Sequence, residues 1–181
     1  MAAWRRNCPD DQRGILELVF VGSADLPYSL HGLVADLGID DMTTLMESMP
    51  HRACMDLMAD ASGLLLLQPG TMTQLPSKVF EYVSLGKPIV TVADRGSETY
   101  QFAAQRLQTF VAAADDVSEI SNMLTNFVGS VMSGFEPDTA RWSMLLREFT
   151  MPVTMSRVVG LLDDLVAPGA AVGPARSEEA L

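Results

Sequence analysis

Three short, almost wholly apolar runs rich in Leu, Val and Ile stand out along the chain. They span residues 15–21, 64–67 and 88–92, and runs of this length and composition are typical of strands that are buried on both faces. Between them, apolar residues recur at helical spacing, as they do over residues 30–37 and 55–61. Strands that alternate with helices in this way predict a parallel sheet.

Two shorter strands are expected at residues 43–47 and 109–111, which brings the total to about five. Asp116, followed three residues later by Glu119, forms a capping-box pattern that predicts a helix over about residues 117–129. We therefore expect an α/β fold, a Rossmann-like doubly wound parallel sheet of about five strands with helices on both faces.

The last third of the chain has a different character. Residues 142–149 and 158–165 have apolar side chains at helical spacing, with Pro152 between them, and predict two C-terminal helices. The stretch from Ala167 onward is rich in Ala, Gly and Pro without apolar periodicity, which predicts a disordered tail. The expected division is an N-terminal extension, one Rossmann-like domain and a tail, at residues 1–13, 14–166 and 167–181.

Composition narrows the function classes. The chain has 181 residues, 48% of them hydrophobic, which is enough for one domain with a core of its own. Its 23 acidic and 12 basic side chains give a net charge of −11, which argues against nucleic-acid or anionic-membrane binding. Two distant cysteines outside any C-x-x-C pair favour a reduced, cytoplasmic protein. Without an 18-residue apolar run or a leader-like segment, we expect no membrane span and no signal peptide.

Candidate chemistry lies in the loops that follow the strands, because ligands of doubly wound sheets bind beyond the carboxyl ends of the strands. Gly22 and Ser23 begin a small-residue turn that can direct backbone N–H groups toward a phosphate, although a tight strand-to-helix connection also requires glycine there. His51 and Cys54, one helical turn apart, are too few for a metal site, and we expect neither a metal nor a cofactor.

Residues 68–82 are the segment richest in candidate ligand-binding residues. Pro76 can begin a helix that places Lys78 and Glu81 three residues apart on its surface. The two side chains can then bind one ligand, or they can form an ordinary surface ion pair with each other. The chain has only two lysines, Lys78 and Lys87, so this segment is expected to be a local positive feature in an acidic protein.

The stretch LPSKVFEYVSLGKPIVTV resembles the donor-binding segment of the retaining, Leloir-type glycosyltransferases of family four, which reads P-x-K-hydrophobic-x-E-Y and then small-G-K/R-P. The flanking stretches ILELVFVGSADLPYSLHGLVADLGIDD and SMPHRACMDLMADASGLLLLQP also resemble this family, in the family's order. The resemblance covers about residues 14–166. It implies the C-terminal, donor-binding half of a two-domain GT-B enzyme, with a nucleoside-diphosphate sugar as donor substrate.

The resemblance also implies a site. Glu81 is expected to accept hydrogen bonds from the ribose hydroxyls, and the backbone N–H groups of residues 74–77 are expected to face the diphosphate, with Lys78 as an added cation. Thr73 stands where many members carry a Glu that contacts the sugar, and the Pro50 turn is expected near the nucleotide base. The full set of expected donor-binding residues is Gly22, Ser23, Met49, His51, Thr73, Gln74, Leu75, Pro76, Ser77, Lys78 and Glu81.

The family's first donor-domain strand, with its G-R…K signature, has no counterpart in residues 1–13. Hexosyl transfer is therefore expected to require an acceptor-binding partner, either a separate N-terminal half or a second copy in a homodimer. The alternative interpretation is a non-catalytic α/β assembly or regulatory module, favoured by Thr73 and the missing cations. A GT-B-type nucleotide-sugar epimerase ranks last, because the carboxylates and histidine of that family cannot be placed.

Overall fold

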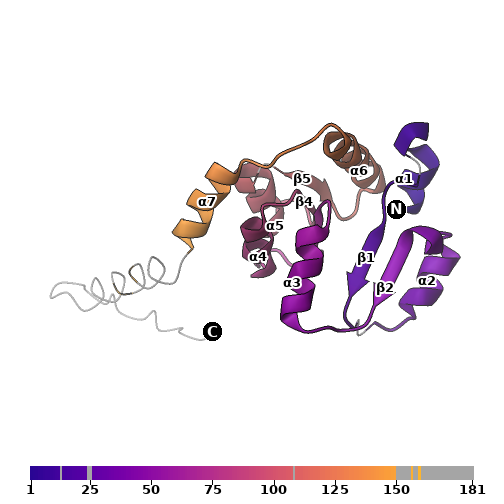
Figure 1. Ribbon diagram of the computed structural model, residues 1–181, viewed down its shortest axis with the longest axis horizontal. Helices are drawn as coiled ribbons and strands as arrows, with labels where there is room; N and C mark the ends of the chain where they lie inside the picture. Colours follow the sequence, from indigo (N-terminus) through magenta and orange to yellow (C-terminus); the bar gives the residue numbers. More distant parts are fainter. Residues whose placement is uncertain (13, 24–25, 108, 150–155, 157–158, 160–181) are drawn as a thin grey trace, which may run out of the picture.

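The computed structural model describes residues 1–12, 14–23, 26–107, 109–149, 156 and 159. Within them the strands and helices alternate as expected (Figure 1). The strands are β1 (Leu18–Val21), β2 (Thr43–Met46), β3 (Leu64–Gln68), β4 (Ile89–Ala93) and β5 (Phe110–Ala113). Every strand pairing is parallel, which confirms the predicted α/β fold.

The strands form two hydrogen-bonded ladders. One has the order β1-β2, with Leu18 opposite Thr43, and the other has the order β3-β4-β5, with Leu64 opposite Ile89. β1 begins later than the apolar run that predicted it, because the chain still turns after Gln12, and Ile15 is 51% exposed.

Helices cover both faces of the strands, as predicted (Figure 1). They are α1 (Ala2–Asn7), α2 (Leu30–Asp36), α3 (His51–Asp60), α4 (Lys78–Leu85), α5 (Glu98–Phe102), α6 (Val117–Met132) and α7 (Thr139–Glu148), with the short turns η1 (Asp10–Gln12), η2 (Asp40–Met42) and the π-type η3 (Ala103–Leu107). None of the described helices is long and apolar enough to cross a membrane.

Successive residues of β3, β4 and β5 point to opposite faces and enter two core clusters. Leu65 and Val90 pack in the first cluster, with buried side chains of α1, α2 and α6. Their neighbours Leu66 and Ile89 pack in the second, with side chains of α4, η3 and α7. The near-continuous apolar runs of β3 and β4 follow from this double burial.

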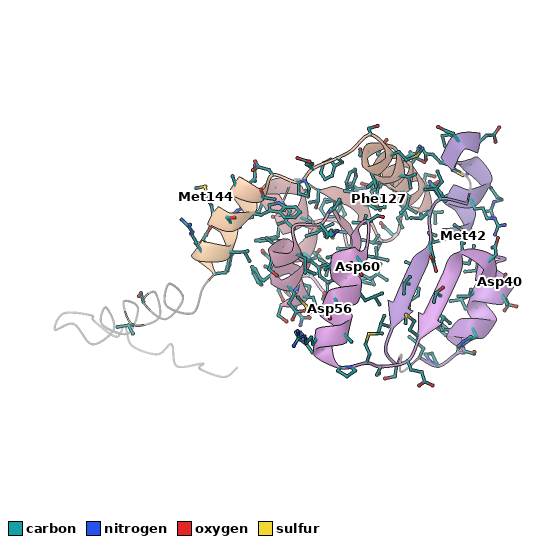
Figure 2. The ribbon with its side chains drawn as sticks, in the orientation of Figure 1. Asp40, Met42, Asp56, Asp60, Phe127 and Met144 are labelled. Carbon is teal, nitrogen blue, oxygen red and sulfur yellow. The ribbon has the colours of Figure 1, made fainter. Side chains whose placement is uncertain are left out.

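The first residues of the chain also enter the core. Trp4 of α1 is 1% exposed and packs in the same cluster as Met42 of η2 and Phe127 of α6, and Figure 2 labels the last two. Arg5 pairs with Asp41 and so joins α1 to η2. The stretch expected to be an N-terminal extension therefore contributes core side chains.

Local signals fix several helix ends. The Asp116 carboxylate accepts a hydrogen bond from the Glu119 N–H at 2.9 Å, which confirms the predicted N-cap of α6. The Glu119 carboxylate does not return to the Asp116 N–H. It accepts from the Ala113 N–H and pairs with Arg95, because tertiary partners compete with the local capping box.

The C-terminal expectations are met in part. α7 confirms the first of the two predicted helices. The second, over residues 158–165, and the tail over residues 167–181 lie outside the described residues apart from Val159, which is helical.

Gly63 gives a direct test of the core between β3 and α6. A Cβ on Gly63 would lie 2.6 Å from two ring atoms of Phe127 and 3.2 Å from the Pro88 carbonyl oxygen. We expect Gly63→Ala to lower the free energy of unfolding by about 1–3 kcal/mol, because a packed ring would have to move. Urea denaturation measures this change. Gly32→Ala is the control, since its Cβ would make only ordinary contacts, and an equal loss there would contradict the steric explanation.

Candidate functional site

The turns after the strands form the candidate rim, and those after β1 and β2 lie side by side. After β1, Gly22 has a φ of 116°, and its N–H donates to the Met46 carbonyl oxygen at the end of β2. A Cβ on Gly22 would lie 3.9 Å from the Ser48 hydroxyl oxygen. The turn that contains Gly22 and the exposed Ser23 therefore lies beside the connection from β2 to α3, which contains Met49.

The loop after β3 is held against the beginning of α5. The Gly70 N–H donates to the Asp94 carboxylate at 2.6 Å, and the Thr99 hydroxyl donates to the Gln74 carbonyl oxygen at 2.7 Å. The Glu98 N–H donates to the Met72 carbonyl oxygen at 2.8 Å. We call residues 69–77 the anchored loop, because these three bonds attach it to the segment that follows β4.

Asp94 and Thr99 hold the anchored loop, and the sequence patterns did not single them out as anchors. Thr99 is buried and looks like one more polar residue at a helix start. Ser97 caps α5, since its hydroxyl accepts from the Tyr100 N–H at 3.2 Å. No local signal marks a side chain whose partner lies 25 residues earlier, as the partner of Thr99 does.

The anchored loop leads into the N-terminus of α4. Pro76 accepts a hydrogen bond from the Val79 N–H at 3.1 Å, and so begins the helical turn as its position predicted. Within the described part of the chain, four N–H groups here have no hydrogen-bond partner, those of Gln74, Leu75, Ser77 and Lys78. Unpaired N–H groups at a helix N-terminus favour an anion.

The Lys78 ammonium and the Glu81 carboxylate both belong to the first turn of α4. Neither side chain forms an ion pair or a hydrogen bond to any other described residue, so the expected alternative of a Lys78–Glu81 ion pair is not formed. Lys78 is exposed and Glu81 is half-buried. Lys87 follows Gly86, which ends α4, so the two lysines lie at opposite ends of the helix and only Lys78 is at the rim.

Tyr82 connects α4 to β3. Its hydroxyl donates to the Leu65 carbonyl oxygen at 3.4 Å. Burial raises the pKa of Tyr82, and the negative charges of Cys54 and Glu81 raise it further.

The raised pKa of Tyr82 predicts a loss of stability in alkali. The folded state binds the phenol proton more tightly than the unfolded state, so stability is fully present below the unfolded pKa, about 10, and falls as pH rises toward the folded pKa. We expect the free energy of unfolding to fall more steeply between about pH 9 and about pH 11 in the wild type than in Tyr82→Phe. Urea melts across this range measure both slopes, and equal slopes would contradict the assignment.

The remaining expected residues are less tightly placed. Met49 is half-buried, and His51 is exposed at the first turn of α3. No hydrogen bond between described residues joins His51 to the anchored loop. Among described side chains, no three of the His, Cys, Asp and Glu type converge as metal ligands. A hollow of about 790 Å³ lies elsewhere, between α1 and η2, and contains none of the expected site residues.

Comparison with known proteins bears on the fold. No protein-family model and no curated protein matches the sequence. Among solved structures, the chain is similar to that of WaaG, a glycosyltransferase involved in lipopolysaccharide biosynthesis, with a TM-score of 0.58 and 16% identity over 92% of this chain. The chain spans 42% of the length of that protein. At this identity the likeness concerns the fold alone, and the chain has a glycosyltransferase-like fold.

Proposed function

We propose that this chain is the donor-binding half of a retaining, nucleotide-sugar-dependent glycosyltransferase of the GT-B type. The observation that supports this proposal is the first turn of α4. There an unpaired carboxylate and an unpaired ammonium stand beside backbone N–H groups that have no partner among the described residues. This combination of an acceptor, a cation and fixed donors suits a ribose attached to a diphosphate.

Each group has a role in the proposed complex. The N–H groups of Gln74, Leu75 and Ser77 donate to the diphosphate oxygens, and Lys78 adds a charge-assisted contact. The ionised Glu81 accepts from the two ribose hydroxyls, since a carboxylate has two oxygens and several acceptor positions. Thr73 contributes at most one hydroxyl toward the sugar. Gly22, Ser23, Met49 and His51 complete the proposed set on the neighbouring turns.

Hexosyl transfer needs more than this rim. The acceptor hydroxyl must be held against the anomeric carbon while cations stabilise the leaving nucleoside diphosphate. Lys78 is the cation that the rim offers at the anchored loop. We therefore propose that transfer depends on an acceptor-binding partner, either a separate half-enzyme or a second copy of this chain.

The second candidate is a non-catalytic assembly or regulatory module with the same fold. Thr73 favours it, because a neutral hydroxyl replaces the carboxylate expected against the donor sugar. In this case the rim would bind no nucleotide.

Calorimetric titration with UDP, GDP and their sugars separates the two candidates. We expect at least one of these ligands to bind with a Kd below about 1 mM, which corresponds to about −4 kcal/mol. Lys78→Ala is expected to weaken binding about twofold to fivefold at low salt, as befits an exposed charge. Lys87→Ala is the matched control, because it removes the same charge from the other end of α4. Absence of binding by every ligand at millimolar concentration would refute the donor-site proposal and favour the module.

A further inference from the structure

Helix α7 packs against the helix that carries Lys78 and Glu81. Its Trp142 and Leu145 are 2% and 5% exposed, and they enter the same core cluster as Val79 of α4. In Figure 1 α7 lies beside α4. Val79 is fully buried and lies between Lys78 and Glu81 in the chain, so the core that α7 completes includes the first turn of the candidate site.

α7 also holds the end of η3. The Arg141 guanidinium donates from Nε to the Arg106 carbonyl oxygen at 2.8 Å and from Nη2 to the Gln105 carbonyl oxygen at 2.7 Å. The Trp142 indole N–H donates to the Leu107 carbonyl oxygen at 3.3 Å. The last carbonyl groups of a helix have no partner within it, and α7 supplies donors to three of them in succession. The planar fork of arginine can bond two neighbouring carbonyl groups at fixed positions, whereas a lysine ammonium on its flexible stem does not.

Phe149, directly after α7, joins α4 to α5. Its ring centroid lies 4.8 Å from that of Phe80 in α4 and 6.0 Å from that of Phe102 in α5. Phe80 and Phe102 also contact each other, with their centroids 6.2 Å apart and their rings edge to face. Aromatic pairs in this range attract each other beyond their buried area. Because Phe80 directly precedes Glu81, the three rings hold the turn that carries this carboxylate against α5.

The helix formed by α5 and η3 connects these contacts to the anchored loop. It covers residues 98–107, a length of about 15 Å. α7 holds its C-terminal end, and at its N-terminal end the buried Thr99 hydroxyl donates to the Gln74 carbonyl oxygen. There the Glu98 N–H also donates to the Met72 carbonyl oxygen. The π-type turn at η3 is a rare geometry that is frequently found at functional sites. A displacement at one end of so short a helix reaches the other end.

We propose that Arg141 and Phe149 are positioning residues for the donor site, an inference that rests on the proposed nucleotide-binding function. Neither residue belongs to the set proposed to touch the ligand. Arg141 fixes the end of η3, and through Thr99 it keeps the backbone N–H groups from Gln74 onward in place for the diphosphate. Phe149 fixes the turn that carries Glu81 relative to α5. The affinity for a nucleotide therefore depends on α7.

Amide hydrogen exchange of the full chain without ligand tests the first step. Arg141→Lys keeps the positive charge and loses the fork, and it is expected to speed exchange of the Glu98 amide about tenfold or more. The bond of this amide to Met72 joins α5 to the anchored loop. The amides of β4, inside its ladder, are expected to keep their rates. Met144→Ala is the control on α7, because Met144 is 72% exposed and points away from the body of the molecule (Figure 2).

Calorimetry with UDP and GDP tests the second step. Arg141→Lys and Phe149→Ala are each expected to raise the Kd of the nucleotide that binds the wild type about threefold to tenfold. Phe149→Tyr keeps the ring and is expected to hold the Kd within about twofold of the wild type. Gly63→Ala is the control for lost stability, because it strains the core beside Phe127, in the other cluster. It is expected to leave both the Kd and the Glu98 exchange rate unchanged.

The positioning role is overturned if Arg141→Lys leaves the Glu98 exchange rate at its wild-type value, or if Gly63→Ala raises the Kd as much as the two α7 variants do. Faster exchange without a change in Kd also overturns it, because α7 would then hold the loop without serving the site. A wild type that binds neither UDP nor GDP refutes the proposed function and the positioning role together. A wild type that binds a nucleotide with the same Kd as Arg141→Lys and Phe149→Ala refutes the positioning role alone.

Discussion

Replacement of Glu81 by alanine is expected to weaken nucleoside-diphosphate binding by about tenfold to a hundredfold, the largest effect of any single change at the proposed site. Glu81 is half-buried on the first turn of α4 and has no ion-pair or hydrogen-bond partner among the described residues. Among the described residues, the substitution therefore removes no ion pair or side-chain hydrogen bond of the free protein. Its full effect falls on the complex, in which two ribose hydroxyls lose a charged acceptor.

Calorimetry with UDP and GDP measures the loss, and two variants make it specific. Glu81→Gln keeps one acceptor oxygen but no charge and is expected to give an intermediate affinity. Asp36→Ala removes an exposed carboxylate at the end of α2 and is expected to leave affinity unchanged within about twofold. An unchanged Kd in Glu81→Ala would show that the ribose is not bound at this carboxylate.

Replacement of Trp4 by alanine is expected to lower the free energy of unfolding by about 3–5 kcal/mol. Trp4 is almost completely buried, and its cluster joins Val34 and Met42, beside the β1-β2 ladder, to Val90 and Phe127, beside the other ladder. The two ladders share no strand pairing, so these side-chain contacts contribute much of what holds them together. A loss of this size is a large part of the stability of a typical domain.

Urea denaturation measures this effect. Trp4→Phe is expected to cost less than Trp4→Ala, because the ring remains, and because the Trp4 indole N–H is buried without a partner among the described residues. Arg6→Ala, an exposed neighbour on α1, is expected to change stability by no more than about 0.5 kcal/mol. A loss below about 1 kcal/mol in Trp4→Ala would mean that α1 does not pack on α6 in solution.

The positions of the strands and several helix starts could be predicted from the sequence. Leu64–Leu67 are apolar at every position and residues 88–92 at all but Thr91, because both faces of β3 and β4 pack in the core clusters. Pro76 and Asp116 mark the starts of α4 and α6 through local hydrogen bonds, which depend on near neighbours in the chain.

The features that the sequence did not predict all depend on distant partners. The division into two ladders depends on which strands are neighbours, and this cannot be inferred from the residues of β1. Arg95 draws Glu119 away from its local cap, and Thr99 bonds a carbonyl group far back in the chain. Trp4 had a recognisable signal, since Trp4 and Cys8 are four residues apart and both are buried, as on one face of a helix.

The hydrogen bonds that hold the anchored loop also bear on the kinetics and entropy of ligand binding. A loop fixed before the ligand arrives avoids an ordering cost of about 0.5–1.5 kcal/mol for each side chain that binding would otherwise immobilise. With the Gln74 carbonyl group and the Gly70 N–H already bonded, the Gln74–Ser77 backbone presents its donors in one arrangement. Association with a diphosphate should therefore follow a single exponential, with a rate proportional to ligand concentration and no slower phase from rearrangement of the loop.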